Sequence, residues 1–464
     1  MLITILIISS LAAYFMDSYH VIIDDKMIEN IIKTDVAESL DLLNFKLFAY
    51  LFLLGILPAA LIMQITIIKI PLKSAIIARL KLIAGALIVA VVTILLFGKF
   101  YAGFFREHKS LRFHANPSYY VYSVGKYLGS FLKHGPMPFQ HIGVDAHIPE
   151  IDEDRELLVL VLGETARADH FSLNGYSKKT NPLLEKENII SFTNTWACGT
   201  STAVSVPCMF SIFDHTENNK DKTLATENIL DIVQRAGVHV IWLDNNSDSK
   251  GVATRIPYKS FKSPDNNPHC DTECRDIGML QDLQKYIDSN PEGDILIVLH
   301  QMGNHGPAYF KRYPEEFEIF TPTCHTNQLE KCTIDEINNT YDNAILYTDY
   351  FLSKTIDLLK NNDEQFETIL FYISDHGESL GENGLYLHGL PYMIAPDAQK
   401  HVPMIMWFGD GQDLKEDINF RKLNSKINNK YSHDNIFHTI LGLFEIETSV
   451  YKTDMDIVFG EQHD

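Results

Sequence analysis

The segment LLVLVLGET, residues 157–165, joins six consecutive aliphatic residues to a glycine, a carboxylate and a hydroxyl. An aliphatic run without polar alternation is typical of a strand that is buried on both faces, as in the parallel sheet of an α/β protein. Gly163, Glu164 and Thr165 would follow the carboxyl end of that strand, where open α/β sheets gather their functional groups. The segment therefore indicates both a fold class and the place of a site.

Four more apolar runs of this kind follow along the chain, at residues 238–243, 295–299, 369–373 and 403–407. Stretches with helical periodicity lie between them, including residues 227–236 and 340–360. Alternating strands and helices predict an α/β sandwich with a central, mostly parallel sheet that is covered by helices. We assign this domain to residues 151–464.

Three apolar runs precede the predicted sheet, at residues 1–16, 48–68 and 82–97. The second and third approach the roughly 20 residues that cross the hydrocarbon core of a membrane, so we expect transmembrane helices there. The first run is shorter and has neither the basic start nor the cleavage site of a signal peptide, which favours a short or truncated span. Residues 1–100 are therefore expected to form a transmembrane helical domain that is shortened at its N-terminus.

The charges of the loops predict the orientation of these spans. The loop after the first run is acidic, whereas the loop between the second and third runs is basic and contains Lys69, Lys73, Arg79 and Lys81. Because Lys and Arg are retained on the cytoplasmic side, we expect the chain beyond residue 97 to lie outside the cytoplasmic membrane. Residues 101–150 are rich in aromatic side chains, which predicts a periplasmic linker with interfacial helices. The net charge of −21 argues against a nucleic-acid partner, which would require a basic face.

The cysteines support an external location. All six lie between residues 198 and 332, in three locally spaced pairs: Cys198 with Cys208, Cys270 with Cys274, and Cys324 with Cys332. An even number in a domain outside the cytoplasm predicts disulfides. A zinc site at the second pair is the alternative, but no pair of His or Cys residues with matching spacing completes a tetrahedral set nearby.

Polar residues follow each of the first four predicted strands, at residues 163–165, 244–246, 300–305 and 374–378. The carboxyl ends of parallel strands meet at one edge of a sheet, so these groups are expected to form a single site. Glu164, Asp375 and His376 supply two carboxylates and an imidazole. That set suits a zinc ion with a position left open for substrate.

A nucleophile is expected in the segment CGTSTAVSVPC, residues 198–208, where hydroxyls precede an apolar stretch. Ser or Thr at such a place commonly caps a helix, and a helix N-terminus attracts phosphate. A hydroxyl bound to a metal has a lowered pKa and becomes a usable nucleophile. Spacing alone does not choose among Thr200, Ser201, Thr202 and Ser205, and capping is an ordinary role for each.

Five motifs together resemble a known family. They are LGETAR (162–167), CGTSTAVSVPC (198–208), DNNSDSK (244–250), HQMGNHGP (300–307) and SDHGES (374–379). In this order they are similar to the lipid A phosphoethanolamine transferases, which include the mobile colistin-resistance enzymes and belong to the alkaline phosphatase and sulfatase superfamily. That family typically has five transmembrane helices, so the resemblance also implies that the first run of this chain corresponds to the third span.

The resemblance implies roles for particular residues. Thr202 is the expected nucleophile, and Glu164, Thr202, Asp375 and His376 are expected to surround the catalytic zinc. A further group is expected to bind the phosphoethanolamine group: Asn246, Lys250, His305 and His388. The two histidines of this group could also act as acid and base or hold a second zinc ion, while His300 is expected to be structural. The three cysteine pairs lie where the family has disulfides.

The reaction implied by the resemblance is ping-pong transfer of phosphoethanolamine from phosphatidylethanolamine, through a phospho-threonine, to a phosphate of lipid A in lipopolysaccharide. The expected consequence is resistance to polymyxin and other cationic peptides. The chain is expected to be a monomeric, multi-pass protein of the bacterial inner membrane with its catalytic domain in the periplasm.

Some alternatives remain open and others do not fit. Transfer to Kdo or a core sugar stays open, as does a glycerol-phosphate transferase or a phosphodiesterase of the same superfamily. A sulfatase would need a C/S-x-P-x-R motif, which the segment after Cys208 does not supply. A non-catalytic receptor on this fold would have lost a metal or nucleophile residue, and all four are present.

Overall fold

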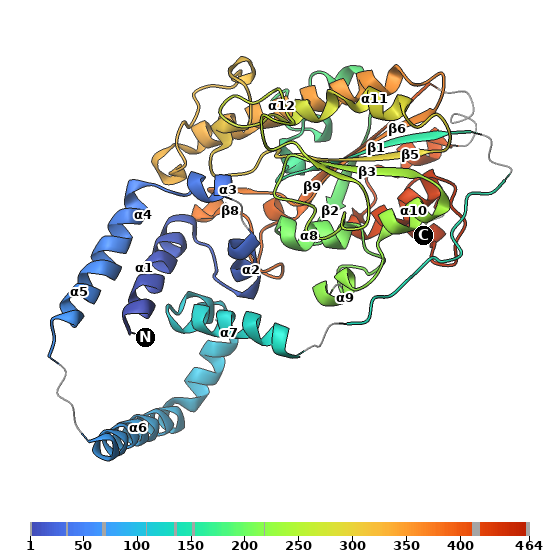
Figure 1. Cartoon of the computed structure of the whole chain (residues 1–464). Coiled ribbons are helices and arrows are strands. Elements are labelled where there is room, and N and C mark those ends of the chain that lie inside the picture. Colours follow the sequence, from blue (N-terminus) through green and yellow to red (C-terminus); the bar gives the residue numbers. More distant parts are fainter. Residues whose placement is uncertain are drawn as a thin grey trace. The chain divides into compact units, whose positions relative to one another are not determined.

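The computed structural model describes residues 2–33, 36–66, 71–107, 109–133, 137–150, 154–217, 219–410 and 418–460. It divides into two compact units (Figure 1). The first comprises Met1–Ser18, Ile22–Ile28 and Asn44–Gly129. The second comprises Tyr19–Val21, Glu29–Leu43 and Ser130–Asp464, so it includes a short segment from the N-terminal part of the chain.

Three helices are long and apolar enough to cross a membrane, as predicted. They are α1 (Leu2–Tyr19), the continuous stretch Phe45–Met63 and the part Leu72–Phe97 of α6 (Leu72–Glu107). The second consists of α4 (Phe45–Tyr50), a π-helical turn (Leu51–Ile56) and α5 (Leu57–Met63). A Cβ atom on Gly55, within that turn, would lie 2.7 Å from Ser10 Oγ of α1, so glycine permits this close approach.

One detail of the predicted topology is wrong. Lys73, Arg79 and Lys81 were expected in a loop, but they belong to the first turns of α6, which begins ten residues before the predicted start. Lys, Arg and Ala are strong helix formers, so the basic stretch continues the apolar helix instead of ending it. Helices α2 (Asp25–Lys33) and α3 (Val36–Asp41) follow the first span, and α7 (Ser118–Lys133) follows the last.

An eight-stranded sheet organises the second unit, with the strand order β10-β2-β9-β6-β1-β5-β3-β4. All five predicted strands are present, as β1 (Glu156–Gly163), β3 (His239–Asp244), β5 (Ile295–His300), β6 (Glu367–Ser374) and β9 (His401–Phe408). The sheet is mostly parallel, as predicted, but β9 is antiparallel to both of its neighbours. Five shorter strands were not predicted: β2 (Ile190–Trp196), β4 (Tyr258–Ser260), β10 (Tyr431–Ser432), and β7 (Ser379–Leu380) with β8 (Tyr386–Leu387), which form a hairpin.

Strand β1 is fully buried and divides the hydrophobic core in two. Leu158, Leu160 and Leu162 face one hydrophobic cluster. Leu157, Val159 and Val161 face the other. The first cluster is covered by α8 (Thr202–Met209), α10 (Ile229–Ala236) and α15 (Ile436–Leu443), and the second by α11 (Leu283–Asp288) and α12 (Ile334–Lys360) (Figure 1). The aliphatic run is thus explained by burial on both faces.

Capping decides where the covering helices begin. Helix α12 starts six residues before the predicted boundary, because Thr333 and Glu336 form a capping box at its N-terminus. Helix α10 has a capping box of Asn228 and Asp231, and it ends at Gly237 in the left-handed conformation with a φ of 115°. These two helices hold opposite faces of the strands whose carboxyl ends carry the site.

Candidate active site

The predicted ligands meet at the carboxyl ends of two adjacent parallel strands. Strands β1 and β6 pair in a register that sets Gly163 opposite Ser374, so the residues that follow them emerge together. Glu164, Asp375 and His376 each offer a ligand atom within 4.8 Å of the others, and all three are fully buried. The structure therefore brings Glu164 together with Asp375 and His376, which follow much later in the sequence.

The charges of this cluster call for a cation. His376 Nε2 lies 3.4 Å from Glu164 Oε1 and 3.3 Å from Asp375 Oδ2. Burial and the neighbouring Glu164 carboxylate raise the pKa of Asp375. Burial alone would lower the pKa of His376, but the carboxylates of Asp375 and Glu164 outweigh it and raise that pKa. Asp375 Oδ2 is buried and finds no hydrogen-bond donor among the described residues. Two buried carboxylate groups and one imidazole nitrogen fit a divalent zinc ion in both charge and donor type.

Thr202 is the hydroxyl that lies at the cluster. It is the first residue of α8, and its Oγ1 lies 3.1 Å from Glu164 Oε2 and 3.4 Å from His376 Nε2. The expected capping role is not observed, because Ser201 occupies the N-cap position without a side-chain hydrogen bond to the helix. Thr200 Oγ1 instead donates to the carbonyl of Leu390 at 2.7 Å.

Asn246 reaches the cluster from the end of β3. Its Nδ2 donates to Glu164 Oε2 at 2.8 Å and to the carbonyl of Gln301 at 2.7 Å. Lys250, four residues on, is buried and donates from Nζ to the Ser247 carbonyl and hydroxyl, both at 2.5 Å. Asn246 thus orients Glu164, whereas the observed hydrogen bonds of Lys250 stay within its own loop.

The two candidate histidines lie side by side near the cluster. The ring of His388 is 4.3 Å from the ring of His376 and 5.4 Å from that of His305. His388 Nδ1 lies 3.2 Å from Glu378 Oε1. Burial lowers the pKa of His305 to about 3. In the part of the chain that the structure describes, no third ligand joins these two histidines into a metal-binding group.

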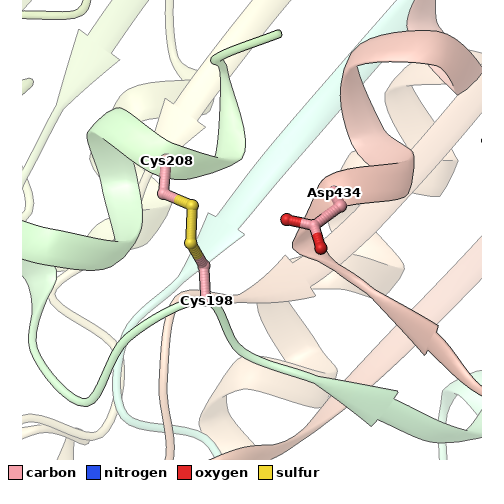
Figure 2. A group of neighbouring side chains, drawn as sticks. All are labelled: Cys198, Cys208 and Asp434. Carbon is pink, nitrogen blue, oxygen red and sulfur yellow. A yellow bond between two sulfur atoms is a disulfide. The ribbon is translucent and has the colours of Figure 1, made fainter. Parts of the chain in front are cut away.

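All three predicted disulfides are present: Cys198–Cys208, Cys270–Cys274 and Cys324–Cys332. The first links the loop before α8 to the helix itself, on either side of Thr202. Asp434 lies beside this pair (Figure 2), but the two sulfur atoms are bonded to each other and offer no thiolates for a metal ion. The predicted reading of the cysteines as disulfides is therefore confirmed.

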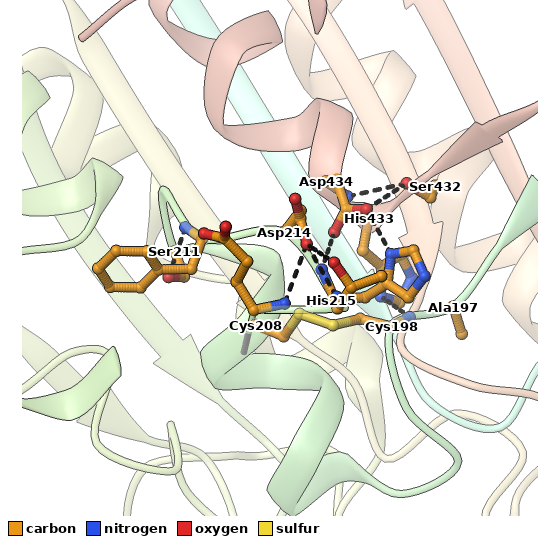
Figure 3. The surroundings of a disulfide bond; sticks show 12 residues. Ala197, Cys198, Cys208, Ser211, Asp214, His215, Ser432, His433 and Asp434 are labelled. Atoms are coloured by element: carbon orange, nitrogen blue, oxygen red, sulfur yellow. Dashed lines mark hydrogen bonds and ion pairs between the residues drawn. A yellow bond between two sulfur atoms is a disulfide. The ribbon is translucent and has the colours of Figure 1, made fainter. Parts of the chain in front are cut away.

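His433 supports the site and was not predicted from the sequence. The backbone N–H of Cys198 donates to His433 Nδ1 at 3.1 Å (Figure 3). His433 Nε2 donates to the Ser374 carbonyl at 3.0 Å. The ring is fully buried, and burial lowers its pKa to about 3. His433 therefore joins the loop that leads to Thr202 to the strand that leads to Asp375. The sequence feature that could have indicated His433 is the polar segment SHDN, residues 432–435, at the end of the short strand β10.

Two further groups support the loops of the site. His300 Nδ1 lies 3.0 Å from Asp244 Oδ2, and both side chains are fully buried, so His300 has the structural environment expected for it. Asp276, which was not predicted either, accepts hydrogen bonds from the backbone N–H groups of Met302 and Gly303 at 2.8 and 3.1 Å. It thereby fixes the loop that leads to His305.

Comparisons with known proteins agree with this architecture. The family model described as "Phosphoethanolamine transferase EptA/EptB" matches residues 1–131, and the sulfatase model matches residues 156–446. The phosphoethanolamine transferase EptA of Escherichia coli K12 is 41% identical over 98% of this chain and 84% of that protein. The phosphatidylethanolamine transferase Mcr-1 of Escherichia coli is 42% identical over 97% of this chain and 84% of that protein.

A solved structure extends this likeness to the whole fold. The integral membrane protein lipooligosaccharide phosphoethanolamine transferase A (EptA) from Neisseria meningitidis superposes with a TM-score of 0.94 at 39% identity, and the match covers 99% of this chain and 86% of that chain. The three apolar helices fit an inner-membrane protein whose soluble domain lies in the periplasm. The chain belongs to the EptA/EptB family of phosphoethanolamine transferases.

Proposed function

We propose that this chain transfers phosphoethanolamine from phosphatidylethanolamine to a phosphate of lipid A, through a phosphoethanolamine ester on Thr202. The observation that carries the proposal is the position of Thr202 Oγ1, at 3.1 Å from Glu164 and 3.4 Å from His376. A hydroxyl held between a buried carboxylate and an imidazole, at the N-terminus of a helix, has the surroundings of a nucleophile for a phosphodiester.

Four residues would hold a zinc ion: Glu164, Thr202, Asp375 and His376. Bound there, zinc would supply positive charge that favours the ionised hydroxyl and the negative charge of the transferring phosphoryl group. Asn246 would keep Glu164 oriented for this purpose, since its Nδ2 donates to Oε2. Positioning of this kind is worth much in phosphoryl transfer, where catalysis is largely placement and electrostatics.

In the first step Thr202 Oγ1 gives up its proton and forms a bond to the donor phosphorus, while the bond from phosphorus to the diacylglycerol oxygen breaks and that oxygen takes up one proton. Diacylglycerol leaves with a proton, which we assign to His388, because its Nδ1 faces Glu378 and its Nε2 remains for the transfer. In the second step an oxygen of the acceptor phosphate bonds to the same phosphorus, and Thr202 is released with a proton. Asn246, Lys250, His305 and His388 are the residues proposed to bind the phosphoethanolamine group.

The choice of donor and acceptor rests on the relatives. One relative is named a phosphatidylethanolamine transferase, and the solved structure is named a lipooligosaccharide phosphoethanolamine transferase. Addition of phosphoethanolamine to a lipid A phosphate brings an ammonium group that would reduce the negative charge attracting polymyxins, so we propose a role in polymyxin resistance. Transfer to Kdo or to a core sugar is the alternative, and the position of the added group on the product distinguishes them.

We also propose a separate role for each of three parts of the chain. Residues 1–100 would anchor the protein in the membrane, residues 101–150 would form an interfacial linker, and residues 151–464 would carry out catalysis. Each step above uses residues of a single chain, which supports a monomer as the working unit.

Intact-mass spectrometry of the purified full chain tests the proposal. The protein is incubated with zinc and fluorescent phosphatidylethanolamine, in the absence of acceptor. The wild type should gain the mass of one phosphoethanolamine group and release diacylglycerol, whereas Thr202→Val, which keeps the shape but lacks the hydroxyl, should do neither. Release of diacylglycerol by Thr202→Val at the wild-type rate would refute the role of this residue.

A further inference from the structure

A cavity opens in the catalytic unit, away from the cluster of Glu164, Asp375 and His376. It has a volume of about 500 Å³, and its walls include Trp196, Tyr392, Tyr431, Lys400 and Lys430. None of these residues belongs to the five motifs of the transfer site. The roles described so far therefore leave this cavity without a function.

The cavity lies at the same edge of the sheet as the transfer site. Strand β9 is antiparallel to both β6 and β2, so β2 runs in the same direction as β6, and β10 is parallel to β2. Trp196 ends β2 and Tyr431 lies in β10, which places both at the edge where Asp375 follows β6. Two strand spacings of about 4.8 Å separate β2 from β6, or roughly 10 Å.

The chain also connects the two places directly. His388, beside the cluster, is four residues from Tyr392, a distance that an extended chain spans in at most about 14 Å. Tyr392 donates from its hydroxyl to the carbonyl of Ala197 at 3.0 Å, and Gly389 donates from its N–H to the carbonyl of Thr200 at 2.8 Å. The wall of the cavity and the loop before Thr202 are therefore fastened to each other.

The lining combines aromatic faces with ammonium groups. Lys430 Nζ lies 5.9 Å from the ring centre of Trp196, and Lys400 Nζ lies 5.3 Å from that of Tyr392. Lys400 Nζ lies 3.5 Å from Asp397 Oδ1, whereas Lys430 is exposed and forms no ion pair with any residue that the structure describes. Tyr431 is 2% exposed, and its hydroxyl has no hydrogen-bond partner among the described residues. Aromatic faces suit the apolar face of a sugar ring, and an ammonium group suits a phosphate.

We propose that this cavity is a subsite for a phosphorylated sugar of the acceptor. It would hold the ring and phosphate that do not react, while another phosphate of the same molecule lies at Thr202. Lys430 provides the charge for the distant phosphate and Trp196 provides a stacking face. This inference rests on the proposed function, because it requires an acceptor built from sugars with more than one phosphate.

The test measures the reaction with the acceptor separately from the reaction with the donor. The full chain in detergent, as wild type, Lys430→Gln and Trp196→Leu, is assayed for transfer to purified lipid A that carries two phosphates or one. Diacylglycerol release without acceptor is measured for each protein. Lys285→Gln is the matched control, since Lys285 is 84% exposed on α11 and does not line the cavity.

We expect Lys430→Gln to raise KM for the acceptor with two phosphates by roughly fivefold to tenfold, the effect of losing one charged contact. Its KM for the acceptor with one phosphate should change little, and its diacylglycerol release should match the control. An unchanged KM for the acceptor with two phosphates would overturn the subsite, and so would an equal loss of diacylglycerol release. Failure of the wild type to release diacylglycerol would instead overturn the proposed function itself.

Discussion

Replacement of His433 by phenylalanine should weaken both the fold and the reaction, because this ring makes two buried hydrogen bonds at once. Phenylalanine keeps an aromatic ring, slightly larger than imidazole, but leaves the Cys198 N–H and the Ser374 carbonyl without their partner. A buried polar group left unsatisfied costs about 1–3 kcal/mol, so the free energy of unfolding should fall by about 2–6 kcal/mol. At roughly 2 °C per kcal/mol for a large domain, the Tm should drop by about 4 °C or more.

The effect on the reaction distinguishes positioning from stability alone. The two bonds join the loop before Thr202 to the strand before Asp375, and a misplacement of reacting groups by about 1 Å can cost on the order of a hundredfold in rate. At a temperature well below the Tm, diacylglycerol release by His433→Phe should therefore fall at least about tenfold, with KM for the donor little changed.

The matched control is His239→Phe. His239 also donates to a backbone carbonyl, that of Glu292 at 3.1 Å, but it is exposed and lies at the opposite end of the sheet. Thermal unfolding and release of diacylglycerol are measured for both variants in the full chain. A His433→Phe protein with the wild-type Tm and rate would refute this reasoning, as would a loss that His239→Phe reproduces.

Three further predictions concern acid, crosslinks and metal. Burial lowers the pKa of His438 from 6.5 to about 4. Its neutral form therefore contributes stability that is fully present above pH 6.5 and is lost as the pH falls toward 4. In unfolding titrations, His438→Gln should reduce this loss of stability in acid by about 1–3 kcal/mol. Loss of the Cys324–Cys332 disulfide, through serine at both positions, should cost about 2–3 kcal/mol of stability, because the bond closes a short loop in the unfolded chain; thermal scans with an unchanged Tm would contradict this. A zinc chelator should abolish diacylglycerol release, added zinc should restore it, and Glu164→Gln should lower the zinc bound per chain in elemental analysis; full activity of metal-free protein would contradict the assignment.

The parts of the fold that depend on local pattern could be predicted from the sequence. The run at residues 157–162 is buried on both faces, and its composition alone indicated this burial. Strand β2 was missed because it reads ISFTNTW, in which apolar and polar residues alternate, and only the pairing with β9 reveals it as part of the sheet. The antiparallel direction of β9 depends on the path of its connections, which hydrophobic pattern does not record.

In the candidate site, too, some residues could be predicted from local pattern and others could not. Glu164, Asp375 and His376 could be predicted to meet, because each follows a strand that reads clearly as parallel. The choice of hydroxyl could not be made from spacing, since it depends on where α8 begins and on the direction in which its first turn faces. The bridging role of His433 requires the pairing of β10 with β2, which brings residues 431–433 to the loop at Cys198 only in the folded chain.

The central position of β1 has a consequence for the newly made protein. Its two partners in the sheet are β5 and β6, at residues 295–300 and 367–374, so the ribosome delivers β1 long before either of them. An apolar strand with two open edges is prone to associate with other chains until both edges are paired. Between its export and the closing of the sheet, the segment that later supports Glu164 is therefore exposed to association with other chains and would benefit from a chaperone.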